Sequence, residues 1–270
     1  SVDVIPSEHF NPVLWTGNGT DGRDITNIGF TPDFVWIKSR SLGSSHLLND
    51  TVRGANKSLF SEGTNAETPN NGGGYLDAFV TDGFSVTSGG SGDAAVNDNG
   101  ATYVAWNWKA GGTASSNTNG SITSSVSANP SAGFSIVTYT GNGTAGATVG
   151  HGLSSVPTLV IAKSRTVSGK HWATYVESLG NTVRIDLESS GAKITGTGAW
   201  NSTTPTSSLV TIGSQSDVNT SGAGQLMYCF HSVDGYLKVG SYEGNGNADG
   251  VFVHCGFSPA FIITKSTAAT

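Results

Sequence analysis

One short sequence motif occurs three times in the chain, and this repetition constrains the fold more than any other feature. The strings are VLWTGNGT (13–20), IVTYTGNGT (136–144) and VGSYEGNGN (239–247). The first glycine of each GNG precedes a proline by 15, 16 and 15 residues (positions 17–32, 141–157 and 244–259), and the prolines open PDFVWIKSR, PTLVIAKSR and PAFIITKS. A spacing kept three times indicates internal repeats, and these define the unit of folding.

The repeats predict two complete units and the start of a third. Residues 84–109 match 208–231 in having a strand, a turn rich in Asn, Gly and Ser, and a closing strand that ends in aromatic residues. Residues 110–133 contain almost no large apolar side chain, which is typical of a linker. We therefore expect a first unit at 1–112, a Ser/Gly/Asn-rich linker at 113–133, a second unit at 134–236 and an incomplete third repeat at 237–270.

The apolar runs within each unit are typical of β-strands. They are short, rich in β-branched and aromatic residues, and bounded by Gly, Pro, Asn or Ser. In FVWIK, Phe34 and Trp36 alternate with Val35 and Ile37, which predicts a strand packed on both faces. The nearest helical candidate, 44–60, is interrupted by Gly54 and could equally form a hairpin. The predicted fold class is all-β, with tandem antiparallel β-sandwich units of jelly-roll or lectin-like type.

Charge and hydropathy argue against two classes of partner, nucleic acids and membranes. The net charge is −6 with only 13 Lys and Arg, so a nucleic-acid-binding surface is not expected. No run approaches the ~20 apolar residues that a membrane-spanning helix needs, and no signal peptide is visible at the start. Cys229 and Cys255 are too few for a disulfide framework. We expect two free thiols, with a single bridge as the alternative.

No motif of an enzyme or cofactor site is found. GNG lacks the helix and the Lys-Ser/Thr pair of a phosphate-binding loop, so it is expected to close hairpins. Clusters of Asp and Asn at 91–100 and 243–250 offer oxygen ligands for calcium, but no twelve-residue calcium loop is present and solvated turns are expected. No serine elbow, zinc motif or facing carboxylate pair stands out. The prediction is a protein with no catalytic residues, metal or cofactor.

Six residues are weak candidates for binding. Arg40 and His46 stand six apart, as do Arg165 and His171, and a repeated Arg/His pair could bind an anionic sugar or act in acid–base chemistry. The alternative is that both copies keep the pair for the fold. Four of the six tryptophans fall in predicted strands, whereas Trp172 and Trp200 lie nearer turns and are better placed to stack on a sugar.

Longer phrases resemble a specific group of proteins. The strings GFTPDFVWIKSR, LLNDTVRGANKSLFSEGTNAE, NDNGATYVAWNWKAGG and VPTLVIAKSR are similar to a domain that recurs in virion structural proteins of marine bacteriophages, often labelled tail fibre, and the resemblance covers about 13–265. It implies a particle component, made in the bacterial host cytoplasm, that assembles with other virion proteins. A homo-oligomer is expected, a trimer if the protein is a fibre. The group offers no catalytic residues to transfer.

Two other functions stay open at this point. A lectin-like module would bind host surface glycan through exposed aromatic side chains, and a polysaccharide depolymerase would need a cleft with facing carboxylates. The third repeat carries a further expectation. A unit that begins near 237 must be a truncated domain or contribute its strands to a neighbour, so Phe261 to Lys265 is predicted to pair with another strand.

Overall fold

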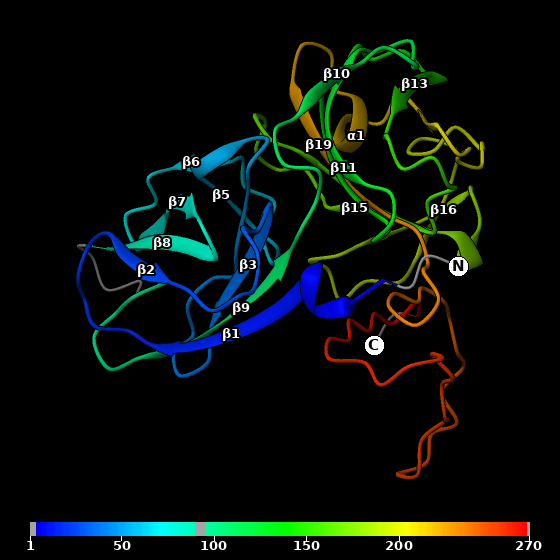
Figure 1. The fold of residues 1–270 in the computed structure, drawn as a ribbon. Helices are drawn as coiled ribbons and strands as arrows, with labels where there is room; N and C mark the ends of the chain where they lie inside the picture. Colours follow the sequence, from blue (N-terminus) through cyan, green and yellow to red (C-terminus); the bar gives the residue numbers. More distant parts are fainter. Residues whose placement is uncertain (1–3, 90–94, 269–270) are drawn as a thin grey trace.

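A computed structural model describes residues 4–89 and 95–268, and it is built almost wholly of antiparallel strands (Figure 1). The helical elements are single turns: η1 (Pro6–Glu8), η2 (Glu177–Leu179) and α1 (Ser216–Asn219). The predicted all-β class of antiparallel sandwich units is confirmed.

The first unit consists of two sheets. The large sheet has the order β1 (Phe10–Thr16), β9 (Thr102–Trp108), β3 (Phe34–Ser39), β4 (Leu47–Asp50), β5 (Gly54–Phe60) and β6 (Thr68–Pro69). The small sheet has the order β2 (Arg23–Ile25), β8 (Gly83–Ser88) and β7 (Gly74–Val80). The segment 44–60 is therefore the β4–β5 hairpin and not a helix.

The second unit repeats this topology. Its large sheet has the order β10 (Ser115–Asn117), β11 (Ser124–Asn129), β12 (Phe134–Thr140), β19 (Gly224–Phe230), β14 (Leu159–Ser164), β15 (Ala173–Val176), β16 (Val183–Asp186) and β17 (Ile194–Thr195). Its small sheet pairs β13 (Ala147–Gly150) with β18 (Leu209–Ile212). From β12 to β17 the order matches that from β1 to β6. The last long strand of each unit therefore lies between two earlier strands of that unit: β9 lies between β1 and β3, and β19 lies between β12 and β14.

The segment 113–133 differs from the linker expected. It forms β10 and β11, and β11 pairs along its whole length with β12. Its serine side chains are held by hydrogen bonds: Ser124 Oγ donates to the Gly150 carbonyl at 2.8 Å, and Ser127 Oγ donates to the Gly112 carbonyl at 2.7 Å. Only Ile122, Val126 and Ala128 of the segment pack against the inner core of the second unit, which leaves little hydrophobic signal in the sequence.

Each large sheet is buried on both faces. In β3, Val35 and Ile37 point to the small sheet of their own unit, whereas Phe34 and Trp36 point the other way, as the alternation predicts. The second unit has its own inner core between its large and small sheets. The outer faces of the two large sheets meet in a third core, so the molecule has a four-layer arrangement.

This third core joins the two units through large apolar side chains. Phe34 lies 4.4 Å from Tyr228 and 6.0 Å from Phe134, measured between ring centroids. The other buried members are Trp36, Leu48, Leu59, Trp108, Ala110, Ile136, Ile161, Trp172, Leu226 and Phe230. Burial of a large apolar side chain stabilises by about 1.5–3 kcal/mol, so this layer makes the two units one body.

A buried ion pair crosses the same core. Arg53 Nε lies 2.5 Å from Asp50 Oδ2, and the Tyr228 hydroxyl of the second unit donates to the same carboxylate oxygen at 2.7 Å. Arg53 also donates to the carbonyls of Leu48 and Lys57, both at 2.8 Å. Burial raises the pKa of Tyr228 well above its usual range; the charge of Arg53 opposes this rise, and the charge of Asp50 adds to it. The charges are thus fully hydrogen-bonded, as buried ions require.

The GNG loops do not close hairpins, in contrast to the prediction. The first loop joins β1, which pairs with β9, to β2, which pairs with β8, so it crosses from one sheet to the other. The buried Asn97 side chain holds it by accepting the Asn18 N–H at 3.2 Å and donating to the Thr20 carbonyl at 2.7 Å. A Cβ on Gly17 would lie 1.9 Å from the Asp98 carbonyl oxygen, which explains the glycine.

The second unit builds the same clamp. Asn219 accepts the Asn142 N–H at 2.9 Å and donates to the Thr144 carbonyl at 2.9 Å, and a Cβ on Gly141 would lie 2.3 Å from the Thr220 carbonyl oxygen. The repeated phrase therefore encodes a corner between two sheets, fixed by a buried asparagine from the loop before the last strand.

The third repeat forms no strand in the described residues, so the predicted pairing of Phe261 to Lys265 is wrong within this chain. Residues 239–268 form an extended coil that runs below the second unit, at the lower right of the view (Figure 1). It is attached by the Phe261 ring, which contacts the rings of Phe10, Trp36, Trp106 and Trp108.

Candidate functional site

Trp172 is not an exposed platform, contrary to expectation. It lies directly before β15 and is fully buried between the two units. Its ring N–H donates to the carbonyls of Phe60 at 2.9 Å and Gly63 at 3.2 Å, both in the first unit. The side chain therefore joins the units and cannot stack on a sugar.

Trp200 is also buried, with 1% of its surface exposed. It lies in a turn, but its ring points into the inner core of the second unit and meets Tyr175 edge-on at 5.9 Å. The turn has no regular period, so the sequence could not show the direction of this side chain. Trp106 is the one tryptophan of the six that is half-buried; the others are buried.

The two histidines do not occupy equivalent positions. His46 lies directly before β4, whereas His171 lies two residues before β15, so Trp172 is the residue that takes the place of His46. The loop of the second unit is one residue longer, which makes the spacing from the arginine equal by coincidence. The Arg/His pair therefore recurs in the sequence, but its two histidines do not lie at equivalent positions in the structure.

The two arginines follow equivalent strands but have different environments. Arg165 forms a two-pronged ion pair with Glu67 of the first unit, with both N–O distances at 3.0 Å. Arg40 is exposed. Arg165 therefore fastens the second unit to the first, in a geometry that suits the planar guanidinium.

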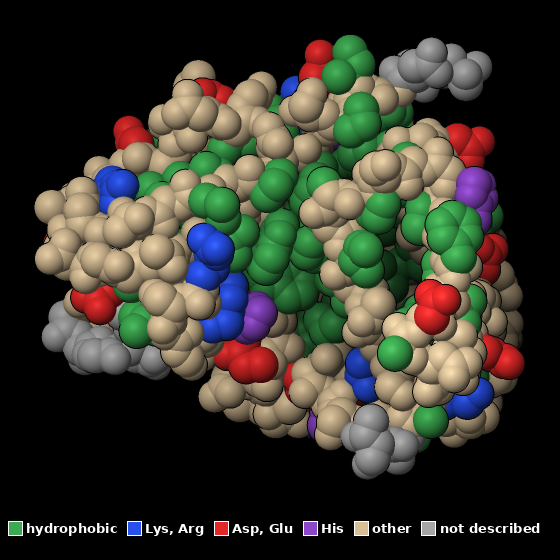
Figure 2. Space-filling model, turned by 90° about the horizontal axis from the view of Figure 1, so that it is seen from below, with side chains coloured by type: hydrophobic (Ala, Val, Ile, Leu, Met, Phe, Trp, Pro, Cys, Tyr) green, Lys and Arg blue, Asp and Glu red, His purple; other side chains and the backbone are tan. Residues whose placement is uncertain are grey.

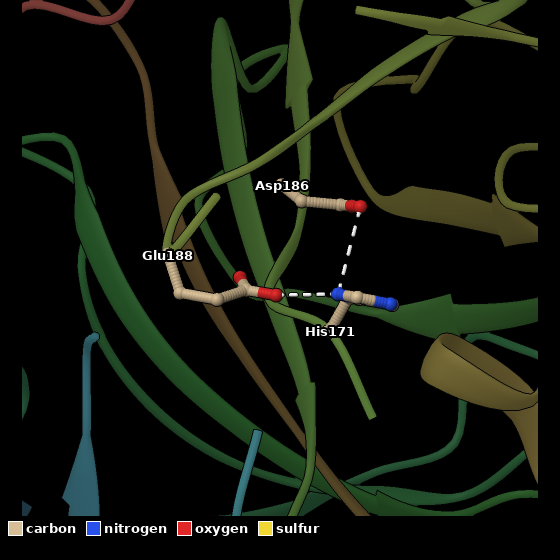
Figure 3. Close-up of side chains that lie close together, drawn as sticks. All are labelled: His171, Asp186 and Glu188. Carbon is tan, nitrogen blue, oxygen red and sulfur yellow. Dashed lines mark hydrogen bonds and ion pairs between the residues drawn. The ribbon is translucent and has the colours of Figure 1, made fainter. Parts of the chain in front are cut away.

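His171 belongs to a cluster that the sequence did not indicate. Its Nδ1 lies 2.5 Å from Glu188 Oε1 and 3.7 Å from Asp186 Oδ2. Figure 3 shows the two carboxylates approaching the imidazole from the end of β16 and the residues after it. One potential ligand atom from each residue lies within 4.8 Å of the others. Imidazole and carboxylate are ligand types that divalent cations accept.

Neighbouring charges already satisfy part of this cluster. Arg184 Nη1 lies 2.6 Å from Asp217 Oδ2, and Arg184 Nε lies 3.2 Å from Asp186 Oδ1. Burial raises the pKa of Asp186 despite the charge of Arg184. For Asp217, burial also favours the neutral acid, but the hydrogen bond from Arg184 and further bonds outweigh it and lower the pKa.

Glu188 accepts a backbone hydrogen bond that has a counterpart in the first unit. Its Oε2 accepts the Trp172 N–H at 3.1 Å, and in the first unit Glu62 Oε2 accepts the His46 N–H at 3.2 Å. The strand registers place Glu62 and Glu188 at equivalent positions. A carboxylate therefore holds the start of the fourth strand in both units. The equal spacing of the glutamate in SLFSE (58–62) and RIDLE (184–188) carries this equivalence in the sequence.

The arrangement favours a structural interpretation of the cluster. Glu188 binds a backbone N–H and His171, and Asp186 is paired with Arg184. A cation would have to displace His171 from Glu188 and compete with Arg184 for Asp186. Hydrogen bonds of this kind are the usual way in which buried charges are satisfied.

The oxygen-rich turns also serve the fold. Asp98 follows the clamping Asn97, and its backbone N–H donates to the Tyr103 hydroxyl at 2.9 Å. In the third repeat, Asn245 donates to the Asp249 carbonyl at 3.1 Å. Asp93, the other carboxylate of the first cluster, lies outside the described residues.

A buried lysine completes the boundary between the units. Lys163 is fully buried, and its Nζ donates to the carbonyls of Ser164 at 3.1 Å and Thr64 at 3.3 Å. Nζ also lies 5.9 Å from the centre of the Trp172 ring. Burial lowers the pKa of this amine to about 8. The equivalent Lys38 is less buried and donates to loop carbonyls of its own unit, those of Leu42 and Ser44.

The two cysteines are free, with Cys229 buried and Cys255 partly exposed. Burial raises the pKa of the Cys229 thiol to about 12, so it packs as an apolar side chain. None of the helices in the described residues is long and apolar enough to cross a membrane.

Fold and polar contacts together define an all-β protein of tandem sandwich units, whose repeated polar residues serve loops and strand starts. One protein family, described as a domain of unknown function (DUF7483), matches residues 5–270. The chain belongs to this family. No curated protein and no solved structure matches it.

Glu188→Ala and Glu62→Ala should each lower the free energy of unfolding by about 1–3 kcal/mol, because each leaves a backbone N–H without its acceptor. Urea unfolding measures this, with the exposed Glu243→Ala as the matched control. A Zn²⁺-dependent rise in the melting temperature of the wild type that is absent from His171→Ala would contradict the structural interpretation.

Lys163→Met should remove a pH dependence of stability. The folded pKa of about 8 lies below the ordinary 10.5, so the unfolded chain binds more protons between these values and stability rises with pH in that window. The gain is about 1–3 kcal/mol. Between pH 7 and about 9.5, below the titration of unfolded tyrosine, stability should rise more steeply in the wild type and in Lys38→Met than in Lys163→Met, while the raised pKa of Cys229 opposes the rise equally in all three proteins. An unchanged slope in Lys163→Met would contradict it.

Proposed function

We propose that the chain is a non-enzymatic structural component of a bacteriophage virion, a fibre or a decoration of the particle surface. The observation that carries the proposal is the fusion of two repeats into one body through a buried aromatic layer. Repeat proteins that stack in this way build extended surfaces from identical supersecondary units. The resemblance to virion proteins of marine bacteriophages points to the same role.

The use of the polar residues supports this proposal. The positions that the two repeats share are devoted to scaffolding: Asn97 and Asn219 clamp loops, and Glu62 and Glu188 hold strand starts. Arg165, one of the candidate binding residues, forms an ion pair with Glu67 in the contact between the units. Contacts that stabilise the fold and that both repeats share are expected in a protein with a structural role.

Antibodies raised against the purified chain should decorate intact phage particles at a fixed position. Electron microscopy of gold-labelled particles measures this, with pre-immune serum as the control. The symmetry of the labelled site would distinguish a fibre from a capsid decoration. Label confined to lysate proteins, with particles left bare, would contradict the proposal.

A glycan-binding role is the second candidate, and one groove favours it. A groove of about 650 Å³ lies between the two units and the third repeat, with Trp36, Trp106, Ser61, Glu62 and His46 among its walls. Indole rings provide apolar faces, while hydroxyl and carboxylate groups bind sugar hydroxyls. The Phe261 ring lies 5.2 Å from that of Trp106 and covers part of this surface.

Binding to a glycan array should then be lost in Trp106→Ala, because Trp106 is the half-buried indole of the groove. Phe252→Ala, which removes an exposed aromatic ring elsewhere, is the matched control and should keep binding. Equal binding by both variants, or none by the wild type, would remove this candidate.

A further inference from the structure

The groove of about 650 Å³ beside the first unit has a polar lining that the second unit does not repeat. His46, Ser61 and Glu62 line it, and residues 260–265 form one of its sides. Figure 2 shows a hollow on the face seen from below, with apolar side chains gathered in it and with charged side chains and a histidine at its edge. In the second unit the fully buried Trp172 takes the place of His46. The shared fold therefore does not require a histidine at this position.

The imidazole of His46 is held in one tautomer. The indole N–H of Trp36 donates to His46 Nδ1 at 3.0 Å. Because an indole can only donate, Nδ1 carries a lone pair and the proton of the neutral ring is on Nε2. Burial lowers the pKa of His46; the charge of Glu62 opposes this shift and that of Lys38 adds to it. No side chain or carbonyl in the described part of the chain accepts a hydrogen bond from Nε2, so His46 has one N–H donor left for a ligand.

Glu62 supplies an acceptor next to this donor. Its Oε2 accepts the backbone N–H of His46 at 3.2 Å, and the residue is exposed. A carboxylate can accept about four hydrogen bonds, and no cation among the described residues pairs with this one. Ser61 Oγ can both donate and accept. The groove thus combines a donor, an acceptor and a hydroxyl on neighbouring positions.

Trp106 supplies the apolar face of the groove. Its ring lies 6.2 Å from that of Trp36, measured between ring centroids, and the two planes meet at 85°. Trp36 is buried and donates to His46, whereas Trp106 is half-buried. A ligand ring can therefore stack on Trp106 while Trp36 holds the histidine. A flat apolar face beside a few convergent polar groups suits a sugar, which has one C–H face and a rim of hydroxyl groups.

The charges of the groove disfavour an anionic ligand. Besides the imidazole, its ionisable lining residues are Glu62, Glu188 and Lys265. Lys265 Nζ already donates to two backbone carbonyls, at 3.1 and 3.2 Å. Lys38 and Arg40 do not line the groove. A carboxylate on the ligand would therefore meet Glu62 without a free cation to offset the repulsion between like charges.

We propose that the groove binds an uncharged sugar whose ring stacks on Trp106, with one hydroxyl accepting the Nε2–H of His46 and a neighbouring hydroxyl donating to the Glu62 carboxylate. The inference rests on the glycan-binding candidate, and it adds the class of sugar and the residues that select it. Trp36 is a positioning residue, because its N–H fixes the tautomer of His46. A uronic acid carries a carboxylate in place of the C6 hydroxymethyl group of a neutral sugar, and this carboxylate is repelled by Glu62.

A glycan array that pairs neutral sugars with their uronic acids tests the class of ligand. It carries oligosaccharides of glucose, galactose and mannose beside linkage-matched oligosaccharides of glucuronic, galacturonic and mannuronic acid. The wild type is expected to bind at least one neutral member about tenfold more tightly than its acidic counterpart. Glu62→Gln keeps an oxygen for the His46 N–H but removes the charge, so it should narrow this ratio.

Two replacements of His46 separate the roles of its nitrogens. Asparagine can place its amide near Nδ1 and keep an acceptor for Trp36, whereas glutamine can place its amide near Nε2 and keep the donor. His46→Asn should lose about tenfold in affinity for the neutral sugar, and His46→Gln should keep most of it. Arg40→Gln is the matched control, because Arg40 is exposed and does not line the groove. It should leave both the affinity and the neutral-to-acidic ratio unchanged.

Nitrogen NMR shifts of the His46 imidazole test the tautomer without any sugar, and a proton on Nδ1 would overturn the proposal. Equal binding of neutral and acidic sugars, or equal losses in His46→Asn and His46→Gln, would overturn it and leave the glycan-binding candidate in place. So would a preference for acidic sugars that Arg40→Gln abolishes. A wild type that binds no sugar on the array would remove the glycan-binding candidate and this inference together.

Discussion

The aromatic layer between the two large sheets is the contact on which the rest of the structure depends. A sheet that is apolar on both faces needs a cover on each side, and the small sheet of a unit covers only one. In the first unit the other face carries Phe34, Trp36 and Trp108; Phe34 packs on Phe134 and Tyr228 of the second unit, and the Phe261 ring packs on Trp36 and Trp108. A single unit would leave this surface in water, so duplication is a physical requirement of the sequence.

The boundary between the units explains why the repeats have diverged. Both copies keep the residues that act within a unit, such as the clamping asparagine and the glycine of the loop it holds. The residues that act between units differ: Asp50 and Arg53 belong to the first unit and Tyr228 to the second, and Glu67 pairs with Arg165 across the join. Each of these contacts is made once and takes a different residue from each unit, so the two faces that meet differ in sequence.

The sequence was informative wherever a regular period existed. The alternation in FVWIK predicted a strand packed on both faces, with Phe34 and Trp36 on the side opposite to Val35 and Ile37, and the spacing of GNG and proline located the repeats. Loops gave no such information. The direction of Trp200 and the one-residue insertion that separates His46 from His171 in the structure both depend on irregular backbone, whereas the equal spacing of Glu62 and Glu188 after their strands is a signal that the sequence does carry. β11 was missed for another reason: its apolar contribution to the core is confined to Val126 and Ala128, and serine hydroxyls and backbone pairing hold the rest.

The third repeat follows from the same constraint that joins the first two. The outer face of the first unit extends past the area that the second unit covers, since Phe261 finds room there against Trp106 and Phe10, and Leu14 on β1 is 61% exposed. The side chain that fills this space is the equivalent of Phe34, which makes the matching contact between complete units. The outer face of the first large sheet thus forms the core between the first two units and also packs on the next repeat. One surface therefore contributes both to the stability of the fold and to the packing of successive repeats.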